Sequence, residues 1–127
     1  MLGTVNGGEA VWVNANAAFT MRLPPGTAIA SASLRGIASG WSLNAVGDSL
    51  TPSDFNKAIG ATTPAAGEIP INITALWAWD AVLAKWYYFA PSLEKSAGLA
   101  NFIQSKNYLD FGARVLDPTM GFWVSKQ

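Results

Sequence analysis

The chain contains no cysteine and no histidine among its 127 residues. These absences exclude disulfides, Cys/His zinc sites, thiol nucleophiles and the Ser-His-Asp triad. Charge is also sparse, because only 13% of residues are charged and eight acidic residues balance eight basic ones. Without a basic tract the chain lacks the electrostatic footprint of nucleic-acid binding, so nucleic acid is not an expected partner.

Catalytic signatures are missing as well. The sequence has no nucleophile elbow, dinucleotide-binding, phosphate-loop, H-E-x-x-H or EF-hand pattern. Paired carboxylates can hydrolyse glycosides without histidine, but the eight acids are scattered and most stand at predicted turns or helix starts. We therefore expect no enzyme, no catalytic residue, no metal and no cofactor, and a carboxylate-only enzyme is the weakest interpretation.

Long hydrophobic runs are scarce. The one stretch of nearly membrane-spanning length, residues 73–90, carries Asp80 and Lys85 near its middle, and both are costly at the centre of a bilayer. The N-terminus shows no basic region followed by an apolar run. We expect no membrane span and no signal peptide in this chain.

Apolar and aromatic residues are abundant, since 50% of the chain is hydrophobic and six residues are tryptophan. Glycine, proline and asparagine interrupt the sequence at short intervals, which favours strands and turns over a helix bundle. The length fits one domain with a core. We predict a single β-rich domain over 1–127, either a small β-sandwich or an open barrel, with one or two short helices.

Local patterns assign the elements. Strands are expected over 10–15, 18–22, 29–34, 40–47 and 121–125, with a short extended piece at 108–111. Helices are expected over 52–59, where Thr51 is the N-cap and Pro52 the first helical residue, and over 96–105. Residues 61–70 are expected to form an exposed loop.

Residues 74–80 and 85–90 are predicted to form a hairpin around the loop 81–84. If Asp80 faces Lys85, the register pairs Trp79 with Trp86, Ala78 with Tyr87, Trp77 with Tyr88 and Leu76 with Phe89. The alternative is an alanine-rich helix over 75–85, which propensity alone favours. Both faces of the hairpin are apolar, so a second layer or another subunit must cover it.

One short pattern occurs twice. Residues 10–14, AVWVN, are echoed by residues 121–125, GFWVS, at the other end of the chain. This spacing is typical of a tandem array in which a chain opens with the closing strand of the preceding unit. Residues 1–22 are therefore predicted to hold an extra strand that pairs within its own domain or is donated to a neighbouring copy.

Five segments carry a resemblance to a known kind of module: GWSL (40–43), ITALWAWD (73–80), KWYYFAPSL (85–93), YLDFG (108–112) and GFWV (121–124). Together they make residues 38–125 resemble an uncharacterised module of large secreted or surface proteins of proteobacteria. The resemblance implies an extracellular or cell-surface β-rich module and carries over no catalytic residue. The apolar hairpin loop departs from the polar loop expected there.

The favoured hypothesis is a non-enzymatic extracellular structural or adhesive module that self-associates, for example as a filament or surface-array subunit built by strand addition. Its partners are copies of itself or other surface proteins. The residues expected to mediate assembly are Val11, Trp12, Val13, Val82 and Leu83.

The alternative hypothesis is a carbohydrate-binding module that stacks aromatic side chains on a polysaccharide. The candidate residues are Trp77, Trp79, Trp86 and Tyr88. Most of these are nevertheless expected in the core, since leucine and isoleucine are few and each buried aromatic ring supplies a large contact area.

Overall fold

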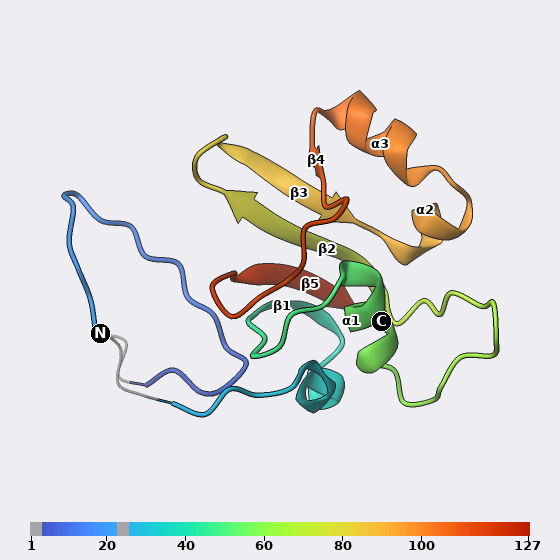
Figure 1. The fold of residues 1–127 in the computed structure, drawn as a ribbon, viewed down its shortest axis with the longest axis horizontal. Coiled ribbons are helices and arrows are strands. Elements are labelled where there is room, and N and C mark those ends of the chain that lie inside the picture. The colour runs from blue at the N-terminus through green and yellow to red at the C-terminus, as the bar shows by residue number, and fades with distance from the viewer. Residues whose placement is uncertain (1–3, 23–25) are drawn as a thin grey trace.

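The structure is a computed structural model that describes residues 4–22 and 26–127. Its centre is one sheet of five strands in the order β1-β5-β2-β3-β4 (Figure 1). The strands are β1 (Gly40–Asn44), β2 (Ile73–Asp80), β3 (Lys85–Phe89), β4 (Leu109–Asp110) and β5 (Phe122–Lys126). The helices are a 3-10 helix, η1 (Ser31–Gly36), and α1 (Pro52–Ala58), α2 (Pro91–Lys95) and α3 (Leu99–Lys106). The predicted mainly-β class with short helices is confirmed, in the form of one sheet that does not close.

The last strand of the chain, β5, is an interior strand of the sheet. β5 pairs antiparallel with β1 on one side and with β2 on the other, while β2 pairs antiparallel with β3. β3 and β4 are parallel, which makes the sheet mixed. The edges of the sheet are therefore β1 and the two-residue β4.

The predicted hairpin is confirmed together with its register. Asp80 pairs with Lys85, Trp79 with Trp86 and Trp77 with Tyr88, so the alternative helix is wrong. The turn is closed by the Asp80 side chain, whose Oδ1 accepts hydrogen bonds from the N–H groups of Val82, at 3.0 Å, and Leu83, at 2.9 Å. This Asx-type turn fixes the hairpin although its loop is apolar.

The turn predicts an effect of pH on stability. The hydrogen bond from the Leu83 N–H, with that from Val82 and the nearby Arg114 charge, lowers the pKa of Asp80 below its ordinary value of 3.8. A carboxyl whose pKa is lower in the folded than in the unfolded chain stabilises the fold above its unfolded pKa, and this contribution is lost as pH falls through the folded pKa.

We expect the urea midpoint to fall as pH is lowered from about 5 to about 2, and to fall less in Asp80→Asn than in the native chain. The remaining fall belongs in part to Asp54 and Asp117, whose pKa values are lowered by hydrogen bonds from Thr51 and Thr119. Urea titrations at several pH values check this, and an unchanged pH profile in Asp80→Asn contradicts it.

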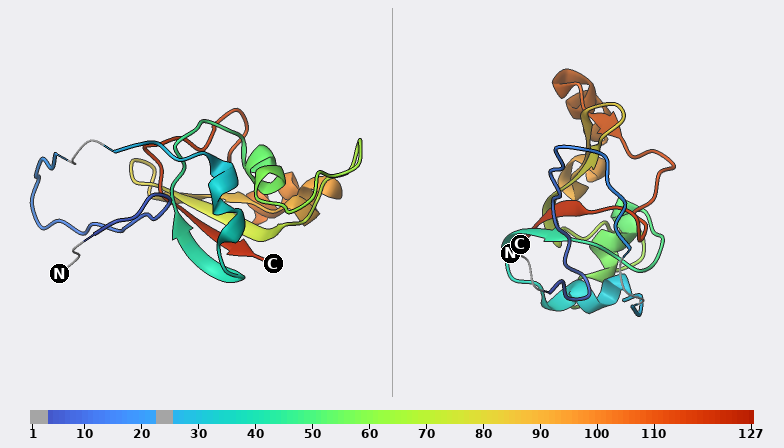
Figure 2. Two further views of the ribbon diagram at one scale, coloured as in Figure 1. Left: turned by 90° about the horizontal axis from the view of Figure 1, so that it is seen from below. Right: turned by 90° about the vertical axis from the view of Figure 1, so that its left-hand side faces the viewer.

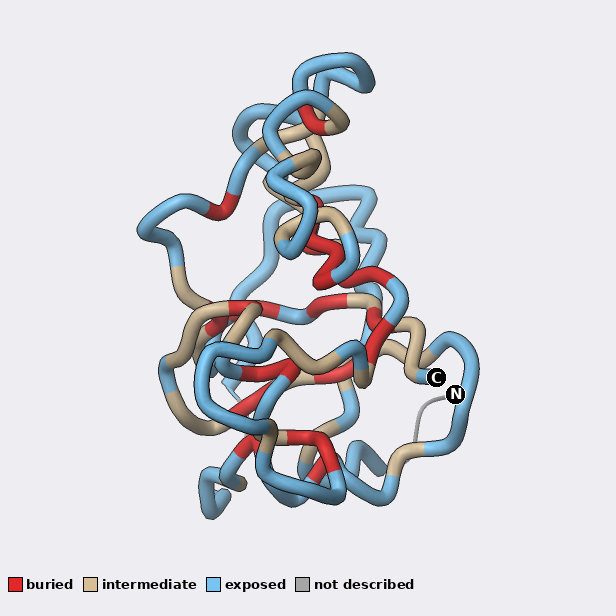
Figure 3. The backbone as a smooth tube through the Cα atoms, turned by 90° about the vertical axis from the view of Figure 1, so that its right-hand side faces the viewer, coloured by how far each residue is buried: buried red, intermediate tan, exposed pale blue. Residues whose placement is uncertain are grey.

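One face of the sheet packs on the main core. Alternate residues of the central strands point to this face and are buried, among them Leu76, Ala78, Phe122 and Val124. Helices η1 and α1 cover it, and Phe55 of α1 meets Phe122 edge to face at 5.1 Å. Buried residues accordingly concentrate along the sheet and beneath these helices (Figure 3).

Helix α1 begins as predicted. Thr51 is extended and its side chain accepts a hydrogen bond from the Asp54 N–H at 3.1 Å, while Pro52 occupies the first turn. Capping and a proline at the first position, where no N–H is needed, are strong local signals. The helix therefore starts where the sequence places it and ends one residue early, at Ala58.

Asn56 of α1 is fully buried and joins the helix to the start of β2. Its Nδ2 donates to the Pro70 carbonyl at 2.7 Å, and its Oδ1 accepts from the N–H groups of Asn72, at 3.0 Å, and Ile73, at 3.2 Å. This one side chain therefore satisfies three backbone groups where the predicted loop 61–70 returns to the sheet. The loop itself is confirmed.

Three predicted strands are wrong. Residues 10–15 and 18–22 are irregular and nearly all exposed, because strand pairing beside β1 stops at the isolated bridge between Glu9 and Asn44. Residues 29–34 instead lead into η1, at whose start the Ser31 N–H donates to the Asp48 carboxylate at 3.2 Å. A carboxylate that accepts a donor from the first turn stabilises a helix start, and propensity gives no sign of it.

The helical region after β3 divides in two. Pro91 follows β3 and is also the first residue of α2, a helix that the sequence did not predict. Proline suits the first turn of a helix. Ala97 then has a left-handed backbone, with φ 54°, so α3 starts at Leu99 rather than Ser96. The short piece expected at 108–111 is confirmed as β4, and the terminal strand is confirmed as β5.

Candidate functional site

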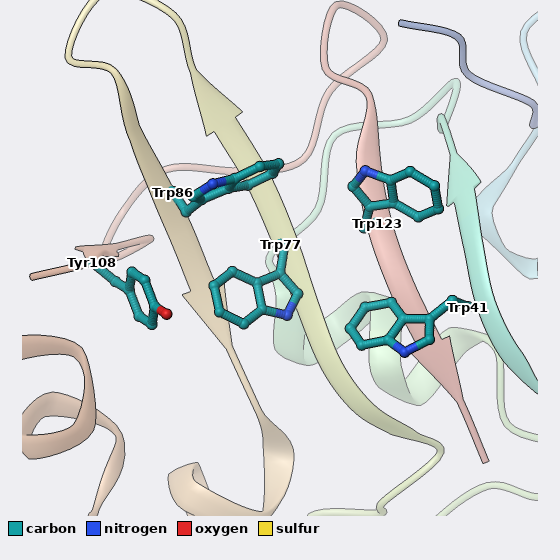
Figure 4. Close-up of a pocket in the computed structure, with 5 residues that line it drawn as sticks. All are labelled: Trp41, Trp77, Trp86, Tyr108 and Trp123. Carbon is teal, nitrogen blue, oxygen red and sulfur yellow. The ribbon is translucent and has the colours of Figure 1, made fainter. Parts of the chain in front are cut away.

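The face of the sheet opposite the main core carries a row of aromatic side chains. Each of four neighbouring strands supplies one tryptophan: Trp41 from β1, Trp123 from β5, Trp77 from β2 and Trp86 from β3. Successive residues of a strand point to opposite faces, so the neighbours of these tryptophans along the central strands, Leu76, Ala78, Phe122 and Val124, point into the main core. Figure 4 shows the four indoles and Tyr108 side by side across the sheet.

These five residues, Trp41, Trp77, Trp86, Tyr108 and Trp123, line a shallow groove of about 430 Å³, which we call the aromatic groove. Trp77 is at its centre. The centroid of its ring lies 4.8 Å from that of Tyr108 and 6.2 Å from that of Trp86, both edge to face. Such pairs prefer tilted or edge-to-face geometry, which holds the rings in fixed orientations.

One end of the groove is closed by α3. A second, smaller core forms there, in which Ile103 and Phe102 of α3 cover Tyr88 and Ala75 of the sheet. The rings of Tyr88 and Phe102 are 4.9 Å apart, and burial raises the pKa of the Tyr88 hydroxyl. The helix thus covers only one end of this face.

The other end of the groove is bordered by residues 10–22, which we call the N-terminal arm. Trp12 of the arm lies 6.1 Å from Trp86, edge to face. Val11 and Trp12 also line a small hollow with Leu43, Trp79 and Gly121. Between this end and α3 the aromatic groove stays open to solvent.

The groove is apolar and uncharged. None of its five lining residues carries a charge, and Trp41 at the sheet edge is 60% exposed. The indoles also bring N–H donors to the groove, and Figure 4 shows the Tyr108 hydroxyl directed toward the Trp77 ring. Within the described residues no buried side-chain donor or acceptor lacks a partner. The groove therefore presents flat apolar rings with a few open hydrogen-bonding groups.

The candidate glycan-binding residues divide between several environments. Trp77 and Trp86 line the groove. Trp79 packs beside Trp86 at 5.0 Å but belongs to the hollow under the arm. Tyr88 is buried beneath α3. The expectation that most of these residues are core holds for Tyr88, which is buried, and in part for Trp77, which is half-buried against the smaller core, whereas Trp79 and Trp86 are half-buried outside it.

Sequence reasoning missed Trp41, Tyr108 and Trp123 as site residues. Two of them stand in correctly predicted strands, but the groove exists only because β5 inserts between β1 and β2 and sets Trp123 opposite Trp77. The signal available in the sequence was the alternation within 40–44 and 122–126. It predicts to which face of the sheet each tryptophan points, but it does not predict which strand lies beside it.

The residues proposed for assembly are exposed. Val11, Trp12 and Val13 lie in the irregular arm, and Val82 and Leu83 form the tip of the hairpin, where Val82 is 93% exposed. The first three are consecutive in the arm, whose Trp12 contacts Trp86 near the same end of the hairpin. Their role in assembly stays a prediction.

A polar cluster lies on the other face of the hairpin. Arg114 Nη1 is 3.2 Å from Asp80 Oδ2 and donates to the Tyr87 hydroxyl at 2.8 Å, with its guanidinium over the Tyr87 ring. These contacts join the loop after β4 to the hairpin. Across residues 4–22 and 26–127 there is no group of three acidic side chains able to hold a metal ion. No helix within the described part of the chain has both the length and the apolar character needed to cross a bilayer.

Comparison with known proteins adds no relative. No protein-family model, curated protein or solved structure matches the chain.

Proposed function

We propose that this chain is a carbohydrate-binding module whose aromatic groove stacks on the sugar rings of a neutral polysaccharide. A single observation carries the proposal. Five aromatic side chains from neighbouring elements form one open, uncharged groove on the part of a sheet face that lies between α3 and the N-terminal arm. Exposed apolar surface of this kind marks a binding site in a small domain.

The chemistry of the groove fits a sugar ring. A pyranose offers an apolar face of C–H groups and an edge of hydroxyls, so it pairs with an aromatic face and with donors placed beside it. Trp41, Trp77 and Trp123 supply rings with N–H donors, and the Tyr108 hydroxyl supplies a further polar group. Ligand sites commonly combine such an apolar lining with a few oriented polar groups.

The lining of the aromatic groove carries no charge, which disfavours charged ligands. Proteins that stack nucleic-acid bases combine aromatic side chains with a positively charged groove, which these five residues do not provide. Binding of an acidic polysaccharide likewise requires lysine or arginine side chains to pair with its negative charges. A neutral glycan is the class that this lining suits.

The width of the groove indicates a chain of sugars rather than one ring. Trp41 and Trp86 are separated by three strand spacings, which amounts to about 14 Å across the sheet. Since the groove is open rather than enclosed, a long polymer can lie across it without its ends being trapped. Such a site recognises the interior of a polysaccharide.

Electrophoresis through gels that contain single neutral polysaccharides, such as a β-glucan, a xylan or a mannan, tests the proposal. We expect at least one polymer to retard the native chain, and we expect that affinity to change little between about 0.05 and 1 M salt, because no charged contact is screened. Loss of retardation at high salt, or no retardation by any of the neutral polymers, contradicts the proposal.

Trp41→Ala is the variant that locates the site. Removing one stacked ring is expected to weaken binding about 5- to 30-fold, from a loss of about 1–2 kcal/mol per ring. Phe19→Ala is the matched control, since Phe19 is 58% exposed and Trp41 60% exposed, but Phe19 does not line the groove. Equal losses in the two variants place the site elsewhere.

The extracellular location expected from the sequence is part of this proposal, since polysaccharides of this kind lie outside the cell. Self-association, which the sequence favours, concerns the N-terminal arm and β1 rather than the aromatic groove.

A further inference from the structure

Strand β1 is a sheet edge on which pairing has begun and then stops. On its outer side, the Ala45 N–H donates to the Gly8 carbonyl at 2.9 Å and the Ala10 N–H to the Leu43 carbonyl at 3.4 Å. These two bonds flank the antiparallel bridge between Glu9 and Asn44. Beyond Ala10 the chain leaves β1 and crosses the end of the sheet toward Trp86.

The rest of this edge offers backbone groups to another strand. In an antiparallel ladder, outward-facing N–H and C=O groups recur at every second residue. Leu43 and Ala45 face outward, so Trp41 does as well. Within the described residues no backbone hydrogen bond reaches Trp41 from that side. Unpaired edges of this kind are templates for strand addition.

The N-terminal arm carries large apolar side chains that its own chain covers only in part. Its large apolar side chains are each about half exposed: Val11, Trp12, Val13, Phe19 and Met21. Beyond the contacts of Val11 and Trp12, the arm stands away from the sheet and helices as a long loop (Figures 1 and 2). Its apolar surface is therefore available to a partner.

The arm also resembles a strand that already pairs with β1. Residues 10–14 read AVWVN and residues 121–125 read GFWVS, and β5 runs antiparallel to β1 on the inner side. The register started by Glu9 and Asn44 is antiparallel too. Extended along β1, it sets Val11 opposite Ser42 and Trp12 opposite Trp41.

In this extended register the side chains of the arm also fit the two faces of the sheet. Trp12 then lies on the aromatic face beside Trp41, where cross-strand aromatic pairs are favourable. Val11 and Val13 point to the opposite face. Alternation of this kind is what a sixth strand on β1 requires.

We propose that residues 8–14 of one copy exchange onto β1 of a second copy and continue as a sixth strand to Trp41. The exchanged segment replaces the recipient's own short contact at residues 8–10, so that few bonds are lost and the ladder lengthens. Exchange of an identical segment between copies is a low-cost route to association. This inference does not depend on sugar binding by the aromatic groove.

Because each copy has a single arm, only two forms of assembly are expected. Each copy has one arm and one β1 edge, so two copies close into a reciprocal dimer, or successive copies run head to tail into a filament. Light scattering over a concentration series, with electron microscopy of large species, identifies the form. A monomer at every concentration overturns the proposal.

Cysteine cross-linking tests the register, because the chain has no cysteine of its own. A Val11→Cys chain is mixed with a mass-tagged Ser42→Cys chain and oxidised mildly. In the proposed register these positions form a non-hydrogen-bonded pair about 4.5 Å apart at Cα, which a disulfide can span. We expect a disulfide-linked heterodimer on a non-reducing gel.

The matched control mixes Val11→Cys with Trp41→Cys, whose side chain points to the other face of the sheet. We expect at least about tenfold less heterodimer from this pair, because the geometry cannot be bridged. Equal yields from the two mixtures, or no heterodimer from the first, overturn the proposed register. Unfolding curves of the three single variants confirm that each chain is folded.

A chain with both Val11→Cys and Ser42→Cys separates exchange from pairing within one molecule. We expect its cross-link to join two chains. A cross-link confined to single chains in dilute solution means that the arm folds onto its own β1, which overturns exchange. Retardation by polysaccharide in the same samples is a separate readout, so failure of one proposal is distinguishable from failure of the other.

Discussion

Replacing Trp77 with alanine is expected to weaken polysaccharide binding about 10- to 100-fold, a larger loss than at any other groove position, since stacking contributes about 1–3 kcal/mol per ring. Trp77 is the central ring. It touches Trp86 and Tyr108, so its removal takes away one stacking surface and also frees the orientation of two neighbours. Isothermal titration with a soluble oligosaccharide of a retained polymer measures the change.

Trp79→Ala is the control for this prediction. Trp79 belongs to the same strand and face, two residues further on, and is likewise half-buried, but it does not line the groove. We expect Trp79→Ala to lose clearly less affinity than Trp77→Ala, because Trp79 contacts only one ring of the groove, Trp86, and supplies no stacking surface within it. Trp77 also packs against Tyr88, so unfolding curves of both variants are needed. Equal affinity losses in two folded variants contradict a site centred on Trp77.

Replacing Asn56 with alanine is expected to lower the free energy of unfolding by about 3 kcal/mol or more, since each buried group left without a hydrogen bond costs about 1–3 kcal/mol. The variant leaves the Pro70 carbonyl and the N–H groups of Asn72 and Ile73 unpaired beneath α1. Ile73 starts β2 and is itself fully buried. The loss therefore reaches the central sheet.

Urea unfolding followed by tryptophan fluorescence measures this change. Asn101→Ala is the matched control, because Asn101 is exposed on α3 and has the same side chain. We expect the control to lie within about 0.5 kcal/mol of the native chain. An Asn56→Ala variant as stable as this control would show that water or rearranged neighbours replace the three hydrogen bonds.

The sequence determined the parts of this protein that depend on neighbours in the chain. The hairpin and its register follow from alternation on both sides of a four-residue loop, with Asp80 and Lys85 as the closing pair. Helix α1 follows from a cap and a proline within a few residues of each other. The hairpin closure and the helix cap depend on residues that are close in the sequence. Contacts with distant parts of the chain agree with them and leave both elements as predicted.

The arm shows where such local signals fail. Residues 10–14 have a strand pattern as clear as that of β5, yet only β5 is a strand in the single chain. A strand needs partners for its backbone and a layer over its apolar side chains, and both lie elsewhere in the structure. The pattern of residues 10–14 therefore predicts that the segment is able to form a strand. Whether it does so depends on whether the tertiary structure places another strand beside it.

The aromatic groove was decided by tertiary structure alone. Alternation along the sequence predicts to which face of its strand each tryptophan points. The order β1-β5-β2-β3 brings Trp41 and Trp123 beside Trp77, although more than eighty residues separate the first two along the chain. Strand order depends on long-range contacts, and the cover supplied by α3 depends on where that helix lands. The sequence therefore determined which residues are aromatic and which way each points, while packing between distant segments determined which of them stay open to solvent.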